Sequence, residues 1–190
     1  MPSSPKVLKE TILETAYSIL IRDGYGSINI KNLAKELGCS TQPISRQFGS
    51  MEGLRDALLD YCLVKFAKAF TIKGEHVADI VLSVAQGYID LAYDYPNVYK
   101  YLYMSEQDGE KMSTMAHSQR AAHYGKVIEM LEIEYEITTE KAFDFMRNME
   151  YYVHGIASYI ATEYIKDDKE DVMKRIESVR DIFLTLAQSR

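Results

Sequence analysis

Apolar residues recur every three or four positions along most of the chain, and this spacing predicts helices. The first such series ends at Asp23-Gly24, a pair typical of a helix terminus. It consists of Leu8, Ile12, Ala16, Ile19 and Leu20. No alternation of apolar and polar residues lasts long enough to predict a strand. The sequence therefore predicts an all-α protein of about nine helices. We expect them near residues 6–23, 29–37, 41–47, 51–72, 75–94, 96–105, 110–136, 139–165 and 169–188.

Breaks in the helical pattern divide the chain into a small N-terminal part and a larger C-terminal part. The Lys73-Gly74 pair is the expected boundary, because glycine interrupts a helix there. We expect a first domain at residues 1–50, a linking helix at 51–72 and a helical domain at 75–190.

Composition limits the class of protein further. Of the 190 residues, 47% are hydrophobic and 26% are charged, which excludes a disordered, collagen-like or membrane-spanning chain. No apolar run approaches the roughly 18 residues of a membrane span, and residues 1–6 lack the apolar stretch of a signal peptide. The two cysteines, Cys39 and Cys62, are too few for a disulfide framework. We therefore expect a reduced, cytoplasmic protein without membrane partners.

The net charge of −6 is unevenly distributed. Residues 1–54 carry six basic and five acidic side chains, whereas residues 55–190 carry 16 basic and 23 acidic ones. If a nucleic acid is the partner, only the first part of the chain can face it, because the acidic remainder would be repelled.

Residues 29–47 have the spacing of a helix-turn-helix motif. Such a motif needs a small residue where its helices touch, a glycine in the turn and a branched apolar anchor. Ala34, Gly38 and Ile44 meet these needs at intervals of four and six residues. We expect Ser40 to cap the second helix by accepting from the amide of Gln42. An apolar underside is completed by Leu33, Leu37, Cys39 and Phe48.

The remaining side chains of the second helix point outward and are polar. They are Thr41, Gln42, Ser45, Arg46 and Gln47. Hydroxyl, amide and guanidinium groups read base edges or hold phosphates in a major groove. From the spacing alone, DNA binding and a plain helical hairpin with a solvated face both remain open.

Residues 12–54 closely resemble the N-terminal domain of TetR-family transcriptional regulators. The resemblance is carried by "IL..A...L...G" followed by "INIKNLAKELGCSTQPISRQFGSMEGL". It implies a three-helix DNA-binding head, a linking fourth helix, and a C-terminal domain that binds a small-molecule effector and dimerises. It further implies a ligand-responsive repressor that binds a pseudo-palindromic double-stranded operator as a homodimer.

The resemblance also assigns roles to individual residues. Asn29 takes the place of a threonine that caps the helix expected at 29–37, and Lys31 takes a position that often contacts the DNA backbone. Thr41, Gln42 and Ser45 become groove-facing, together with Gln47. With the residues singled out above, the expected DNA-binding set is Lys31, Ser40, Thr41, Gln42, Ser45, Arg46, Gln47 and Ser50.

Two residues depart from the family pattern. Ser45 stands where the family usually has tyrosine, and Met51 where it usually has lysine, and both usual residues touch phosphates in relatives. Their absence predicts weaker non-specific affinity and a shallower salt dependence, or compensation by Lys6, Lys9 and Arg46. The amides that begin the helix expected at 51–72, with Ser50 as cap, can still receive a phosphate.

From residue 75 onward the chain is rich in tyrosine and methionine. These residues either fill an ordinary helical core or line an apolar cavity with hydroxyl groups in its wall. The resemblance favours a cavity. The residues expected to line it are Tyr88, Tyr99, Tyr103, Met115, Tyr124, Met149 and Tyr152.

The last two predicted helices have more apolar surface than one core absorbs. Tyr152 and Tyr159 lie beside the main stripe of helix 139–165, and Ile182 and Leu184 beside that of helix 169–188. Such helices usually pack on a partner, and the resemblance implies a four-helix interface between two subunits. A broad buried helix within a monomer is the alternative. The expected interface residues are Tyr152, Ile156, Tyr159, Val179, Ile182 and Phe183.

Three other functions find less support. The pair Glu150 and His154 has no counterpart for a di-metal centre, and no nucleophile motif or phosphate-binding glycine loop occurs, so we expect neither catalysis nor a cofactor. A redox sensor would use Cys39 or Cys62, but both fit apolar packing better. A binding module that uses a protein partner or a small ligand, with little specific DNA binding, remains the main alternative.

Overall fold

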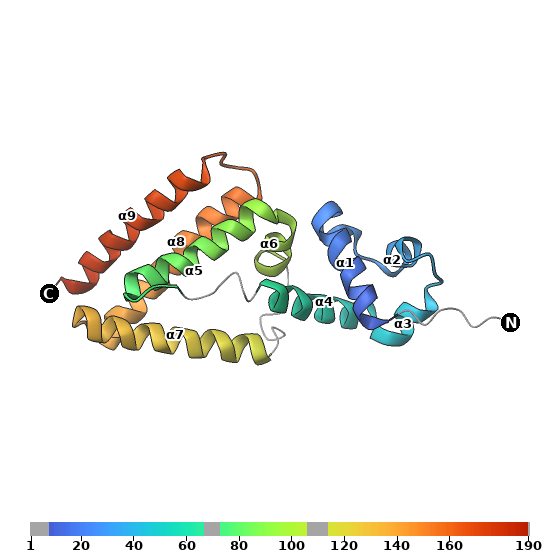
Figure 1. The fold of residues 1–190 in the computed structure, drawn as a ribbon, viewed down its shortest axis with the longest axis horizontal. Helices are drawn as coiled ribbons and strands as arrows, with labels where there is room; N and C mark the ends of the chain where they lie inside the picture. The colour runs from blue at the N-terminus through green and yellow to red at the C-terminus, as the bar shows by residue number, and fades with distance from the viewer. Residues whose placement is uncertain (1–7, 67–72, 106–113, 190) are drawn as a thin grey trace. The chain divides into compact units, whose positions relative to one another are not determined.

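The computed structural model describes residues 8–66, 73–105 and 114–189, with the side chains of residues 114–123 left out. All regular secondary structure in these ranges is helical, which confirms the predicted all-α class. The elements (Figure 1) are α1 (Lys9–Asp23), the 3-10 helix η1 (Tyr25–Ser27), α2 (Ile30–Glu36), α3 (Gln42–Phe48), α4 (Met51–Phe66), α5 (Val77–Asp94), α6 (Pro96–Tyr103), α7 (Thr114–Tyr135), α8 (Thr139–Ala161) and α9 (Lys169–Gln188).

Two local features differ from the sequence prediction. The predicted helix 139–165 ends at Ala161, because Glu163 adopts a left-handed backbone conformation with φ 58°. The amide of Tyr164 then donates to the carbonyl of Tyr159 at 2.8 Å, which closes the helix end. The short helix η1 has no counterpart among the predicted helices. The predicted residues 6–7, 67–72 and 110–113 lie outside the described ranges.

The chain forms two compact units. The head comprises Met1–Phe66 and Asn97–Lys111, and the body comprises Ala67–Pro96 and Met112–Arg190. Most of α6 thus groups with the head, although the sequence assigns it to the larger domain. The side-chain amide of Asn97 donates to the carbonyl of Ile21 at 3.0 Å.

The head is held together by α1, which packs against α2, α3 and α4. Its core consists of side chains that are at most 2% exposed. They include Ile12, Ala16, Ile19, Leu20, Leu33, Ile44, Leu54 and Leu58. Burial of this apolar surface stabilises helices that are too short to form alone.

The body is a bundle in which α5 packs against α7, α8 and α9, and α8 also packs against α7 and α9 (Figure 1). Each helix contributes an apolar stripe with a period of three to four residues. Its most buried side chains include Val77, Ile89, Leu131, Ala142, Phe145, Ala157 and Ile176.

Candidate DNA-binding surface

The turn between α2 and α3 depends on Gly38. Its φ is +61°, a conformation that residues with a side chain rarely adopt. Its amide donates to the carbonyl of Lys35 at 3.2 Å, and the amide of Cys39 donates to that of Ala34 at 3.0 Å. These bonds terminate α2, and the chain then turns toward α3. This is the role that the sequence predicts for the glycine.

The two helices of the motif are fixed on their inner side by the predicted anchors. Ala34 is 6% exposed, and Leu33 and Ile44 are fully buried. Leu37, Cys39 and Phe48 are half-buried at the edge of this contact. The predicted apolar underside is confirmed, and α3 is left with one face for solvent.

That solvent face is polar. Thr41, Gln42, Ser45 and Arg46 are all exposed, and Gln47 is half-buried. The side chains of α3 and of its N-cap residue therefore present hydroxyl, amide and guanidinium groups on one side of this short helix. Lys31 on α2, together with Ser40 and Ser50 on either side of α3, is also exposed.

Capping side chains set the starts of α2 and α4. The side-chain oxygen of Asn29 accepts from the amide of Asn32 at 2.9 Å, and the hydroxyl of Ser50 accepts from the amide of Gly53 at 3.0 Å. Both caps agree with the sequence prediction. The expected cap by Ser40 is wrong, because α3 begins one residue later than that cap requires. Thr41 is the N-cap residue, with no capping bond from its side chain.

The end of α3 lies very close to the start of α4. A Cβ atom on Gly53 would lie 2.3 Å from the carbonyl oxygen of Phe48, so only glycine fits there. The ammonium of Lys9 lies 5.5 Å from the centre of the Phe48 ring. This contact holds one cation of α1 beside the C-terminal end of α3.

Not every cation of the head is available to a phosphate. Arg22 pairs with Asp23 at 2.8 Å and with Glu36 at 2.5 Å. These carboxylates raise the pKa of Arg22, and its guanidinium lowers the pKa of Asp23 by hydrogen bonding. The remaining basic side chains of α1 to α3 are exposed: Lys9, Lys31, Lys35 and Arg46.

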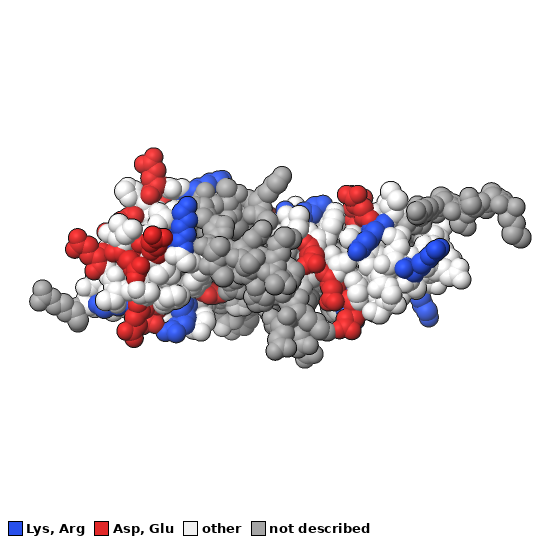
Figure 2. Space-filling view, turned by 90° about the horizontal axis from the view of Figure 1, so that it is seen from below, with Lys and Arg blue, Asp and Glu red and all other residues white. Residues whose placement is uncertain are grey.

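The surface of the body has a different charge. On the face shown in Figure 2, acidic side chains of the body are spread over its helices with basic ones between them. Several of these form ion pairs, such as Lys169 with Asp90 at 2.6 Å and Lys174 with Glu170 at 2.7 Å. This mixed, net acidic surface is unsuited to a phosphate backbone.

The residues expected to line an effector cavity are divided between the two units. Tyr99 and Tyr103 belong to α6 in the head, and their ring centres are 5.1 Å apart. The body holds Tyr88 on α5, Tyr124 on α7, and Met149 and Tyr152 on α8. Met115 lies on α7 among the side chains outside the described ones. The hydroxyl of Tyr124 lies 3.1 Å from a carboxylate oxygen of Glu150.

Each unit has an open hollow on its surface. The hollow of the body measures about 290 Å³ and is lined by Ala92, Tyr93, Pro96, Ile160, Glu163, Ile165 and Lys166. The hollow of the head measures about 340 Å³ and is lined by Tyr25, Asn97, Lys100, Tyr101, Met104 and Ser105. Neither includes a residue of the expected effector site, so that site stays a prediction.

Helices α8 and α9 leave large apolar side chains in solvent. Of the expected interface residues, Tyr159 is 52% and Ile182 is 57% exposed. The others are half-buried: Tyr152, Ile156, Val179 and Phe183. Leu184, expected beside the stripe of α9, is buried and belongs to the core.

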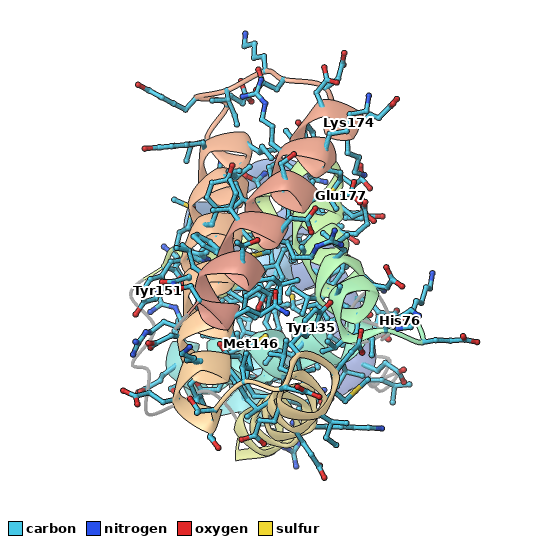
Figure 3. The ribbon with its side chains drawn as sticks, turned by 90° about the vertical axis from the view of Figure 1, so that its left-hand side faces the viewer. His76, Tyr135, Met146, Tyr151, Lys174 and Glu177 are labelled. Atoms are coloured by element: carbon cyan, nitrogen blue, oxygen red, sulfur yellow. The ribbon has the colours of Figure 1, made fainter. Side chains whose placement is uncertain are left out.

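Sequence reasoning misses three exposed apolar residues of these helices: Phe143 is 48%, Tyr151 is 69% and Leu186 is 61% exposed. Tyr151 points away from the bundle (Figure 3).

Comparison with known proteins agrees with this geometry. The family model of bacterial regulatory proteins of the tetR family matches residues 12–58, which span α1 to the first half of α4. No curated protein sequence matches the chain significantly.

Solved structures resemble the chain over nearly its whole length, at low sequence identity. A protein of unknown function from Rhodococcus sp. RHA1 is 18% identical over all of both chains, with a TM-score of 0.75. A TetR variant from Acinetobacter baumannii AYE in complex with minocycline is 17% identical over 97% of this chain and 100% of that one, with a TM-score of 0.63. BioQ with its natural double-stranded DNA operator is 13% identical over 97% and 99%, with a TM-score of 0.57.

The head is thus a helix-turn-helix domain of the class found in DNA-binding regulators. Residues 12–58 match the family model of bacterial regulatory proteins of the tetR family, and the whole chain has the fold of the similar solved structures, which include TetR-like regulators. No helix in the described ranges is long and apolar enough to cross a membrane.

Proposed function

We propose that the protein is a homodimeric repressor that binds a pseudo-palindromic operator and responds to a small-molecule effector. One observation carries the DNA-binding part of this proposal. The turn at Gly38 and the buried anchors Ala34 and Ile44 leave α3 with a row of exposed polar groups that begins at Thr41 and Gln42. A short helix held in this way fits a major groove, where such groups pair with base edges.

Phosphate contacts would come from several parts of the head. Arg46 lies on α3, Lys31 and Lys35 on α2, and Lys9 beside the end of α3. Helix α4 begins at the Ser50 cap, and the first backbone amides of this helix add an uncharged group that can bind a phosphate. With Ser45 and Met51 in place of the usual tyrosine and lysine, we expect modest non-specific affinity and a shallow salt dependence.

A dimer would supply a second head, doubling the contacts and matching a two-fold symmetric operator. The exposed apolar side chains of α8 and α9 support it. The similar structures with minocycline and with an operator support an effector and a DNA partner. An effector could bind more tightly to dimers whose two heads are spaced too far apart or too close to fit successive major grooves. It would then shift the population toward those dimers and lower the affinity for the operator.

The reading face is tested by alanine substitution in the full-length protein. We expect Gln42→Ala and Thr41→Ala each to weaken specific binding by roughly 10- to 100-fold, because each removes a base contact worth about 1–3 kcal/mol. Fluorescence anisotropy on the operator duplex measures the affinity, and circular dichroism checks the fold.

Two substitutions of the same kind on α9 serve as controls. Gln188→Ala and Thr185→Ala change exposed residues of the body and should leave operator affinity unchanged. If all four variants bind the operator like the unaltered protein, α3 does not read it through these residues, and a protein partner becomes the better explanation of the exposed face.

A further inference from the structure

The hollow of the head is lined mainly by one side of α6 and of the turn that follows it. The lining residues from this segment are Asn97, Lys100, Tyr101, Met104 and Ser105. Because they recur at intervals of three and four residues, they share one side of the helix. Tyr25 of η1 completes the lining. The hollow measures about 340 Å³, which is at the small end of the range for ligand pockets.

Hydrogen bonds and a ring contact hold this lining in place. The side-chain amide of Asn97 donates to the carbonyl of Ile21 at 3.0 Å, which attaches α6 to α1. The hydroxyl of Tyr101 donates to the carbonyl of Arg55 at 2.8 Å, which attaches α6 to α4. The rings of Tyr25 and Tyr101 stack, with their centres 5.0 Å apart. The lining is therefore in place before any ligand arrives, which lowers the entropy cost of binding.

The lining combines apolar surface with a positive charge. The ring of Tyr25 is half-buried, and Met104 is 44% exposed. Lys100 is also half-buried, and its ammonium forms no ion pair among the described residues. The guanidinium of Arg55 lies 5.3 Å from the centre of the Tyr25 ring and adds a second cation beside the hollow. The described lining includes no acidic residue, so the hollow attracts an anion.

The hollow of the body does not select a sign of charge in this way. It is lined by Glu163 and Lys166, whose opposite charges offset each other. A ligand there would face one charge of each sign, whereas a ligand in the hollow of the head would face a cation only. Of these two hollows, the hollow of the head is the one that specifies the charge of its ligand.

We infer that the hollow of the head binds a small aromatic carboxylate. The ring of the ligand packs against Tyr25 and Met104, because aromatic rings and methionine sulfur both form favourable contacts with a ring. Its carboxylate accepts a charge-assisted hydrogen bond from the ammonium of Lys100. Tyr99 and Tyr103, the α6 residues expected at the effector cavity, do not line this hollow. The inference therefore adds a second ligand site and does not depend on DNA binding.

Isothermal titration calorimetry of the full-length protein with three probes tests the class of ligand. Benzoate carries both the ring and the charge, benzyl alcohol carries the ring alone, and acetate carries the charge alone. We expect saturable binding of benzoate, and binding of the other two probes weaker by about tenfold or more, because each lacks one kind of contact. Acetate that binds as tightly as benzoate would overturn the aromatic class, and benzyl alcohol that does so would overturn the role of the charge.

Substitution of the cation tests the place of binding. Lys100→Met keeps a long side chain and should weaken benzoate binding by about tenfold or more, because the charge-assisted hydrogen bond is lost. Binding of benzyl alcohol should not change. Lys126→Met is the matched control, because Lys126 on α7 also has no ion pair among the described residues and lines neither hollow. It should leave the binding of both probes unchanged, and circular dichroism checks the fold of both variants.

Substitution of the apolar wall tests the ring contact. Met104→Ala should weaken benzoate and benzyl alcohol by a similar factor of several-fold, because both probes pack their ring on this side chain. Benzoate that binds the Lys100→Met protein as tightly as the unaltered protein would have its site elsewhere, and this would overturn the inference. The absence of saturable benzoate binding to the unaltered protein would overturn it as well. Neither result bears on operator binding, which is measured separately.

Discussion

The local structure requires glycine at two positions of the head, but not at two exposed helical positions of the body. In the head, Gly38 has a left-handed backbone and Gly53 lies against a carbonyl oxygen, so the protomer itself explains both. In the body, Gly125 and Gly155 lie in open helices where a side chain would meet nothing. The difference teaches that the head is specified by local backbone chemistry. The body is specified by the period of its apolar stripes.

The largest effect is expected where the head depends on a missing side chain. Gly53→Ala would place a Cβ atom 2.3 Å from the Phe48 carbonyl oxygen, and backbone cannot yield as a flexible side chain does. We expect a loss of about 2–4 kcal/mol in the free energy of unfolding of the head. Urea denaturation followed by circular dichroism measures it.

Gly26→Ala is the matched control for this substitution. Gly26 is also in the head, and a Cβ atom on it meets no atom within 4 Å. A loss of stability in the Gly26 variant as large as in the Gly53 variant would show that the close approach is not the cause.

A smaller loss of folding stability is expected at one of the two serines that flank α3 and not at the other. Ser50→Ala removes the hydroxyl that accepts from the Gly53 amide, and loss of such a cap costs about 1 kcal/mol. Ser40→Ala removes no capping bond and should change stability by less than about 0.5 kcal/mol. Thermal unfolding compares the two, and equal effects would contradict the placement of the caps.

In the body, adding a glycine should stabilise the protein. Glu136, just after α7, has a left-handed backbone with φ 52°. Glu136→Gly should raise the free energy of unfolding by roughly 0.5–1 kcal/mol, because glycine adopts this conformation without strain. Glu140→Gly, in the first turn of α8, should instead lower it by a similar amount. A melting temperature that falls in both variants would refute this assignment.

The smallest effect near neutral pH concerns Cys62, which is fully buried on α4. Burial raises the pKa of its thiol to about 12, so the folded head keeps it protonated. At neutral pH the thiol is protonated in both the folded and the unfolded chain, so its raised pKa does not change the free energy of unfolding there. Stability is lost as pH rises above the ordinary thiol value toward 12, because only the unfolded chain then releases the proton.

A thiol reagent at about pH 8, near the ordinary thiol pKa, tests this environment. Cys39, which is half-buried at the turn of the motif, should react in the folded protein. Cys62 should react only after denaturant is added. Equal rates for both thiols in the folded protein would contradict the burial of Cys62.

The sequence predicts the head more completely than the body. The anchors Ala34 and Ile44 and the cap Ser50 follow from short-range rules, the cap Asn29 follows from the family resemblance, and the structure confirms all four. The Ser40 cap is wrong because a shift of one residue in the start of a short helix changes which amide is open. Such a shift leaves the pattern of apolar residues unchanged.

In the body, periodicity predicts which residues are helical but not how far each side chain is covered. Helix α8 ends earlier than its pattern predicts, because the signal for its end is a glutamate in a conformation typical of glycine. The assignment of α6 to the head depends on contacts of Asn97 and Tyr101 with residues more than forty positions away. The effector site needs the same kind of long-range information, and the sequence pattern does not contain it.

Selection of DNA from a random pool tests the central claim most directly. Random duplexes are captured on the purified full-length protein, and the enriched sequence is compared with a scrambled duplex by anisotropy at two salt concentrations. Our account predicts enrichment of an inverted repeat and a preference of about a thousandfold or more over the scrambled duplex. Equal, weak binding to every duplex, with no enriched sequence, would contradict it and would favour a protein partner for the exposed face of α3.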